Sequence, residues 1–246
     1  MANHEWTLIW QDEFDRKEID RTRWRLDVGY TGEANGELEF YTDRSENACI
    51  ENSCLVIAAR EENYQGYRYT SARLKTQGLH SWVYGRVEAR IKIPTGQGIW
   101  PAFWMLGEDV TTRGWPDCGE IDIMENVGHR PDTTRGTIHG PGYCRDDGIW
   151  GDYTLTGQRL ADDFHLFAVE WEPTQIRWYV DNILYNTLAV ENVPGKWVFD
   201  HPYFILLNVA VGGHWPGSPD ETTIFPQFMV VDYVRVYSKE VIYEKA

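Results

Sequence analysis

The residues most able to do chemistry are three carboxylates within six positions, Glu120, Asp122 and Glu125. They lie in a segment, Glu120–Glu125, that otherwise reads as a buried strand. Side chains alternate across a strand, so Glu120 and Asp122 share one face. Strict alternation would place Met124 next on that face. A β-bulge at or near Met124 adds one residue and returns Glu125 to the acidic face.

Burying three like charges side by side costs several kcal/mol, and no Lys or Arg lies in this segment. An exposed acidic edge strand is the structural alternative. A metal site is the chemical alternative, but calcium ligands usually come from a loop that wraps the ion, which a regular strand does poorly. Retaining glycoside hydrolysis needs two carboxyl groups about 5–5.5 Å apart, one as nucleophile and one as general acid. The pattern therefore favours this hydrolytic chemistry.

A second strand is predicted at Thr134–His139, after a turn-rich loop that contains glycine, proline and aspartate. A hairpin between the two strands would give the acidic face cationic and hydrogen-bonding neighbours. Its register, uncertain by one residue because of the bulge, pairs His139 with Glu120, Thr137 with Asp122 and Arg135 with Glu125.

Aromatic residues near this hairpin are candidates for sugar stacking. The chain has 12 Trp and 14 Tyr, more than core packing usually requires, and aromatic faces fit the apolar faces of sugar rings. Trp100 and Trp104 share parity and should project from one face. Trp100 and Trp115 favour a binding role, whereas Trp104 fits a cleft or a core equally well.

Further candidates lie upstream. Arg73 is expected on a strand Arg68–Thr76, where Tyr67, Tyr69, Ser71 and Lys75 would share its face. A Gly-rich segment holds Asn35, Glu37 and Glu39 and could form a loop at the cleft.

Composition and strand signals indicate the fold class. Residues 1–246 are long enough for one domain with a sizeable core, and no apolar run approaches a membrane span. No amphipathic helix longer than about three turns stands out. Many antiparallel strands without helices predict an all-β sandwich or jelly roll whose concave sheet holds an extended ligand. The expected strands are Trp6–Trp10, Leu55–Arg60, Arg68–Thr76, Tyr84–Ile93, Ala102–Leu106, Glu120–Glu125, Thr134–His139, Phe164–Glu172, Ile176–Asp181, Tyr203–Val211 and Phe228–Tyr237.

The net charge of −15 argues against nucleic acid and anionic membranes as partners and fits a neutral or cationic ligand. The start, Met1 to Trp6, has neither a basic region nor an apolar signal core. A signal that had been removed would leave the same start. The four cysteines permit two disulfides, with Cys118–Cys144 bracing the site and Cys49–Cys54 across a turn, or four free thiols.

The acidic strand resembles the catalytic Glu-x-Asp-x-x-Glu signature of glycoside hydrolase family 16 in its bulged, laminarinase-type form. The resemblance extends over nearly the whole chain. It includes Gln11-Asp12-Glu13-Phe14, the segments 35–42 and 84–90, Trp100 to Met105, Trp115 to Gly119, Gly136 to His139, 208–213 and 231–237.

This resemblance implies a β-jelly roll that cleaves internal β-1,3 bonds of a glucan such as laminarin with retention and without a catalytic cofactor. Glu120 would be the nucleophile, Glu125 the acid/base and Asp122 a support for Glu120. Residues that match cleft-lining positions are Asn35, Arg73, Trp100, Trp104, Trp115 and His139.

Relatives often hold a structural calcium on the convex side, and Glu13 and Asp232 match side chains used there, whereas Ser53 stands where relatives commonly have glycine. We further expect the chain to be a monomer that acts outside the cell. Two other functions stay open: a hydrolase of the same family acting on mixed-linkage glucan or a galactan, and a non-catalytic glucan-binding module.

Overall fold

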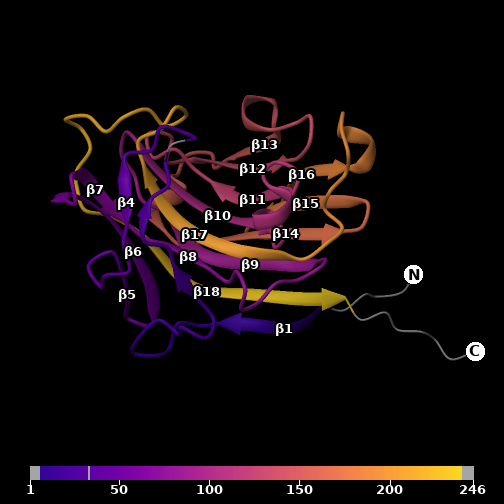
Figure 1. Ribbon diagram of the computed structural model, residues 1–246, viewed down its shortest axis with the longest axis horizontal. Coiled ribbons are helices and arrows are strands. Elements are labelled where there is room, and N and C mark those ends of the chain that lie inside the picture. Colours follow the sequence, from indigo (N-terminus) through magenta and orange to yellow (C-terminus); the bar gives the residue numbers. More distant parts are fainter. Residues whose placement is uncertain (1–5, 33, 240–246) are drawn as a thin grey trace, which may run out of the picture.

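The computed structural model describes residues 6–32 and 34–239, which form two stacked β-sheets (Figure 1). The segment 1–5, where the sequence analysis finds no export signal, lies outside the described residues. The larger sheet has 11 strands and the smaller sheet has seven. All ladders between described strands are antiparallel, except for the parallel pair β4 and β7. The predicted jelly-roll sandwich is thus confirmed, with one parallel ladder added.

The larger sheet is built in the order β16-β15-β14-β9-β18-β6-β7-β4-β3, with β1 beside β18 and β5 beside β6. Its strands are β1 (Trp6–Asp12), β3 (Gly29–Tyr30), β4 (Glu39–Tyr41), β5 (Ala48–Glu51), β6 (Cys54–Tyr64), β7 (Tyr67–Ser71), β9 (Gly85–Lys92), β14 (His165–Glu172), β15 (Gln175–Val180), β16 (Ile183–Ala189) and β18 (Gln227–Lys239).

The smaller sheet has the order β13-β12-β11-β10-β17-β8-β2. It places the acidic strand β11 third from one edge, so that strands flank it on both sides. Its strands are β2 (Arg25–Leu26), β8 (Arg73–Lys75), β10 (Ile99–Gly107), β11 (Glu120–Glu125), β12 (Thr133–His139), β13 (Ile149–Thr154) and β17 (Tyr203–Val211).

Helices are short. They comprise α1 (Val110–Arg113) and the 3₁₀ turns η1 (Arg145–Asp147), η2 (Leu160–Asp162) and η3 (Val190–Asn192). No helix among the described residues has the length and apolar character needed to cross a membrane.

The core fills the space between the sheets, where their inward-facing side chains meet. Strand β17 is buried along all nine residues, and Trp171 and Trp178 of the larger sheet are fully buried. This apolar layer holds the smaller sheet in place from behind and leaves its other face free for polar groups.

One expected strand is in fact two. The segment Arg68–Thr76 leaves the larger sheet after β7 and enters the smaller sheet as β8, with Ala72 between them. The prediction that Tyr67, Tyr69 and Ser71 share a face with Arg73 is therefore wrong, because strand parity does not carry across a change of sheet. Lys75 does stay with Arg73 on β8.

The cysteines form no disulfide, so the bridged alternative is wrong. In the β5–β6 hairpin Cys49 lies opposite Val56 and Cys54 opposite Glu51. The two thiols are thus diagonal neighbours, and Cα atoms in such positions are about 7–8 Å apart, beyond the reach of a disulfide. Cys118 is buried, and its burial raises the pKa of its thiol to about 11.

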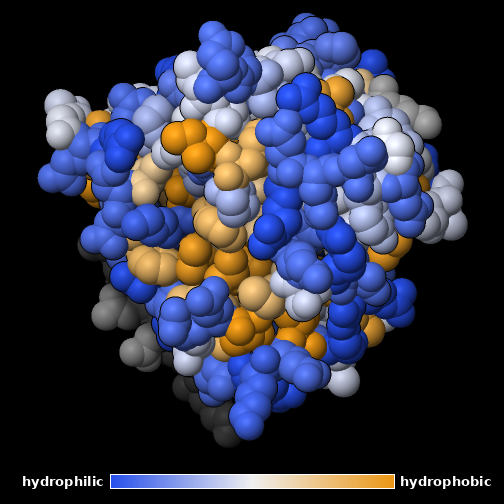
Figure 2. Space-filling view, turned by 90° about the vertical axis from the view of Figure 1, so that its left-hand side faces the viewer, coloured by the Kyte–Doolittle hydropathy of each residue, from blue (hydrophilic) through white to orange (hydrophobic). Residues whose placement is uncertain are grey.

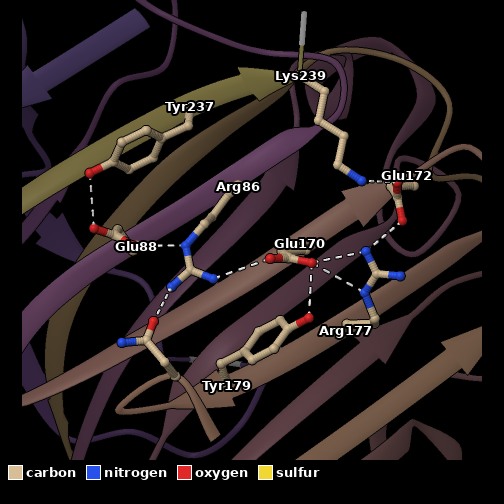
Figure 3. A network of polar contacts seen from close by, with 9 residues as sticks. Arg86, Glu88, Glu170, Glu172, Arg177, Tyr179, Tyr237 and Lys239 are labelled. Atoms are coloured by element: carbon tan, nitrogen blue, oxygen red, sulfur yellow. Dashed lines mark hydrogen bonds and ion pairs between the residues drawn. The ribbon is translucent and has the colours of Figure 1, made fainter. Parts of the chain in front are cut away.

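A network of ion pairs covers the outer face of the larger sheet across β9, β14, β15 and β18 (Figure 3). Glu170 is its centre. It accepts hydrogen bonds from Arg86 at 3.3 Å, from Arg177 at 2.9 Å and from the Tyr179 hydroxyl at 2.9 Å. Its side chain is only 13% exposed, so its charge is stabilised mainly by these hydrogen bonds and little by water.

We expect Glu170→Ala to lower the free energy of unfolding by about 2 kcal/mol, because the largely buried guanidinium groups of Arg86 and Arg177 lose a shared counter-charge. Urea denaturation of the variant checks this. Glu61→Ala is the matched control, since the Glu61–Arg68 pair is 44% and 73% exposed and should contribute less than about 1 kcal/mol. Equal losses in the two variants would contradict a special role for the network.

Candidate active site

The bulge predicted near Met124 is present. The pairing of β11 with β12 shifts register between Asp122 and Glu125, and the pairing with β10 shifts at the same point. On each side of the shift the hairpin has the predicted partners: His139 opposite Glu120, Thr137 opposite Asp122 and Arg135 opposite Glu125. The bulge therefore brings all three carboxylates to one face of the smaller sheet.

The opposite face of β11 anchors this arrangement in the core. Ile121, Ile123 and Met124 are at most 1% exposed. From the larger sheet, the Trp178 indole N–H donates to the Asp122 carbonyl at 2.8 Å. Its ring can approach because Gly136 lacks a side chain: a Cβ there would lie 2.3 Å from Trp178 Cδ1. A hydrogen bond between the sheets thus fixes the backbone of β11 beneath the acids.

Each glutamate is held by an indole from a neighbouring segment. Trp115 Nε1 donates to Glu120 Oε2 at 2.7 Å, and Trp100 Nε1 donates to Glu125 Oε1 at 3.1 Å. The Thr137 hydroxyl donates to the other Glu125 oxygen at 3.3 Å. Two tryptophans that the sequence suggests as sugar platforms therefore also orient the carboxylates.

Burial dominates the titration of the three acids. It raises the pKa of Glu120 to about 7, with repulsion from Glu125 adding to the effect. Burial also raises the pKa of Glu125 to about 7, although the hydrogen bonds from Trp100 and Thr137 oppose the rise. The pKa of Asp122 rises well above its usual range through burial and through repulsion from both glutamates. At neutral pH the three carboxyl groups therefore retain protons between them, as acid–base catalysis requires.

Asp122 and His139 form the inner part of the site. The Asp122 side chain is 3% exposed and hydrogen-bonds to Glu120, and its Oδ2 lies 3.4 Å from His139 Nε2. Burial lowers the pKa of His139 to about 4, so the imidazole is neutral at pH 7. A protonated Asp122 beside a neutral histidine adds no charge to the cluster, which lets Glu120 carry the negative charge.

The wing of the cleft formed by β10, β17 and β8 contains Arg73 and Trp104. Arg73 Nε donates to Asp27 at 2.7 Å, and its guanidinium carbon lies 5.0 Å from the centre of the Tyr41 ring. Trp104 Nε1 donates to the Asn208 side chain at 2.7 Å. Both predicted residues therefore belong to one polar wall beside the acids.

The loop with Asn35 reaches the same wing. The Asn35 amide donates to Glu37 at 3.1 Å, and the carbonyl of Asn35 accepts from the His214 backbone. Glu37 bridges to Gly212, whereas Glu39 is fully buried and its carboxylate accepts from the Val211 backbone N–H. Glu39 thus braces the loop, and its burial raises its pKa to about 8.

Several residues that complete the site are not indicated by the sequence pattern. Asp27 lies on an unpredicted connection before β3, and no local pattern marks it as the partner of Arg73. Asn208 and Tyr41 stand within the quoted motifs, but only the pairing of distant strands shows that the Asn208 amide donates to the Tyr41 hydroxyl at 3.1 Å. The predicted register places Thr137 opposite Asp122 but does not indicate its hydrogen bond to Glu125.

The calcium prediction concerns residues outside the cleft. Arg235 donates to both carboxylate oxygens of Glu13 at 2.8 Å, and Arg90 donates to Asp232 at 2.7 Å. Ser53 has φ of +57°, a conformation that favours glycine. Because arginines already neutralise both carboxylates, these side chains as arranged fit a calcium ion poorly, and the calcium site stays a prediction.

One group of side chains in the described part of the chain could hold a metal. Ligand atoms of Glu120, Asp122 and His139 lie within 4.8 Å of one another. All three also serve the acidic site described above, and two of them are joined by a hydrogen bond, so the grouping itself does not require an ion.

Comparison with known proteins identifies the family. The model of glycosyl hydrolases family 16 matches residues 35–235. The beta-glucanase of Rhodothermus marinus is 45% identical over 243 residues, which cover 94% of this chain and 85% of that protein.

Solved structures agree over nearly the whole chain. The catalytic domain of an endo-1,3-beta-glucanase (laminarinase) from Thermotoga petrophila is 49% identical with a TM-score of 0.92, covering 96% of this chain and 99% of that one. The endo-beta-1,3-glucanase from Pyrococcus furiosus is 49% identical with a TM-score of 0.92, covering 98% and 97%. A family match over most of the sequence and these likenesses show that the chain belongs to glycoside hydrolase family 16.

Proposed function

We propose that this glycoside hydrolase is a retaining endo-β-1,3-glucanase of the laminarinase type. The observation that carries the proposal is the pair of glutamates on one face of β11, each held by an indole N–H and each with a raised pKa. The similarity to two endo-1,3-β-glucanases at 49% identity supports the choice of bond.

In the first step, a carboxylate oxygen of Glu120 attacks the anomeric carbon as the bond to the glycosidic oxygen breaks. Glu125 gives its proton to that oxygen, and the leaving sugar departs as an alcohol. Asp122 donates a hydrogen bond to Glu120 and Trp115 a second, so the nucleophile is oriented and its charge is stabilised. The product is a glycosyl ester on Glu120.

In the second step, the Glu125 carboxylate accepts a proton from water while the water oxygen attacks the anomeric carbon. The ester bond breaks and Glu120 leaves as a carboxylate. Two inversions give net retention. Glu125 needs to be protonated in one step and ionised in the next, and a pKa near 7 suits both states.

The substrate proposed is a neutral β-glucan such as laminarin, and the cleft composition supports it. Asp27 pairs with both Arg73 and Lys75 and offsets one of their two positive charges, so that wing offers hydrogen-bond donors with one positive charge left over. The chain is further proposed to act as a monomer outside the cell, since polysaccharides of this kind are met there.

Glu120→Gln should lower kcat on laminarin by at least about 10⁴-fold, because the nucleophile is removed, and should leave glucan binding largely intact. Glu125→Gln should lose activity on the polysaccharide, yet still release dinitrophenol from an aryl β-glucoside oligomer whose leaving group needs no proton. Steady-state and burst kinetics measure both.

The opposite pattern, in which Glu120→Gln retains the dinitrophenol burst, would exchange the two roles. NMR of the first product provides an independent check, since retention requires the β anomer. A dominant α anomer would refute the double displacement.

Side-by-side release of reducing sugar from laminarin, barley β-glucan, lichenan and agarose tests the bond preference. We expect kcat/KM to be highest for laminarin. A higher kcat/KM on barley β-glucan or agarose would show that the enzyme has another bond specificity of the same family. Binding of a polysaccharide without release of reducing sugar would indicate a non-catalytic module.

The pH profile follows from the raised pKa values. The active enzyme has one proton on the glutamate pair, so kcat/KM should fall as pH rises through about 7, where the acid loses that proton. Thr137→Val removes a donor to the Glu125 carboxylate, which raises its pKa further. The alkaline limb should then move upward by about half a pH unit.

Thr154→Val is the matched control for that measurement, because its hydroxyl contacts Thr133 at 3.0 Å and touches neither glutamate. An unchanged or lowered alkaline limb in Thr137→Val would show that this hydroxyl does not stabilise the ionised acid.

A further inference from the structure

Strand β13 presents a tryptophan and an aspartate side chain on the cleft face of the smaller sheet, beyond the hairpin of the acids. Along β13 exposure alternates, and Trp150 and Asp152 lie on its exposed side. They are opposite Thr137 and Arg135 on β12, which in turn are opposite Asp122 and Glu125. Two rows of side chains therefore run straight from the catalytic strand to the edge of the sheet.

The side chains in these rows contact each other. The Arg135 guanidinium carbon lies 3.7 Å from the centre of the Trp150 ring and 5.1 Å from that of Trp215. Trp215 meets Trp100 edge to face at 5.4 Å between ring centres. Since Trp100 donates to Glu125, a continuous series of rings and one guanidinium leads from the sheet edge to the acid/base.

This series, Trp150, Arg135 and Trp215, is here called the β13 platform. It is held rigidly, because Asp152 accepts from Arg135 Nε at 2.8 Å and from Nη2 at 3.2 Å. It is also open: Trp150 is 50% exposed and Trp215 36% exposed. Exposing two large indoles to water has a cost that a purely structural stack would not require.

The chemistry of the β13 platform fits a neutral sugar. Asp152 cancels the charge of Arg135, so no charged ligand is favoured. An indole face suits the C–H face of a pyranose, while the Arg135 and Asp152 groups suit its hydroxyls. Glu125 lines one small hollow together with Arg135, Asp152 and Trp215, so the acid/base and the platform border the same hollow.

The place of the β13 platform in the smaller sheet indicates its role. Asn208 and Arg73 lie on the β17 and β8 side of the acids, and the platform lies on the β12 and β13 side. A glucan chain whose cleaved bond lies over β11 must cross the strands to touch both sides. We propose that the β13 platform is a distal subsite that stacks a glucose unit of the same β-glucan chain beyond the cleaved bond, favouring long chains over short ones; this rests on the proposed function.

The test compares β-1,3-linked glucose hexasaccharide with trisaccharide. In Trp150→Ala the ratio of kcat/KM for the hexasaccharide to kcat/KM for the trisaccharide should fall about three- to tenfold, through KM rather than kcat. Trp150→Phe should recover part of the ratio. Phe228→Ala, an exposed aromatic on β18 of the other sheet, should leave the ratio unchanged.

A direct measurement uses Glu120→Gln as a background that does not cleave. Calorimetry should show Kd for the hexasaccharide rising about three- to tenfold when Trp150→Ala is added. An unchanged ratio and Kd would overturn the platform, and so would an equal loss on both oligosaccharides, which would indicate a structural effect. Wild-type protein that fails to cleave laminarin would instead overturn the proposed function, so the two failures are separate.

Discussion

Everything in this molecule depends on keeping three carboxyl groups on one face of a single strand. Water cannot solvate Glu120, Asp122 and Glu125 fully where they lie, and their mutual repulsion adds to the cost. The site relieves that cost in two ways, by retaining protons and by offering N–H and O–H donors to the oxygens that stay charged. Acid–base and nucleophilic catalysis require the same two features, a retained proton and hydrogen-bond donors to a charged oxygen. The burial that makes the three carboxyl groups costly therefore also prepares them for the proposed chemistry.

The scaffold supplies the conditions under which that strain can persist. A bulge turns Glu125 inward, and the apolar side of the same strand is fixed in the core. The bond from Trp178 to the Asp122 carbonyl joins the two sheets directly under the acids. A loosely held strand would relax by rotating one acid toward water. The packing of β11 against the core therefore keeps the acids buried, and this burial keeps their pKa values raised.

Local sequence rules predicted what is local. Alternation and its interruption at Met124 predict the bulge, and the hairpin register predicts His139 opposite Glu120, as the structure has them. Contacts between distant segments were beyond such rules. The Arg73–Asp27 pair and the split of Arg68–Thr76 between two sheets depend on how the chain crosses the sandwich, which strand parity does not encode. The disulfide alternative is wrong for a related reason, because the spacing of two cysteines along the chain does not fix the distance between their Cα atoms.

Trp100 and Trp115 show why binding and chemistry are joined in this cleft. An indole N–H that holds a carboxylate fixes the direction of that N–H bond, and the ring contacts of Trp100 with Trp215 and of Trp115 with His139 limit rotation about it. The ring faces are then presented in one orientation beside the acids. In the proposed mechanism, a sugar stacked on such a face is positioned relative to the oxygens that attack and protonate it. Substrate orientation would then depend on the same hydrogen bonds that tune the acids.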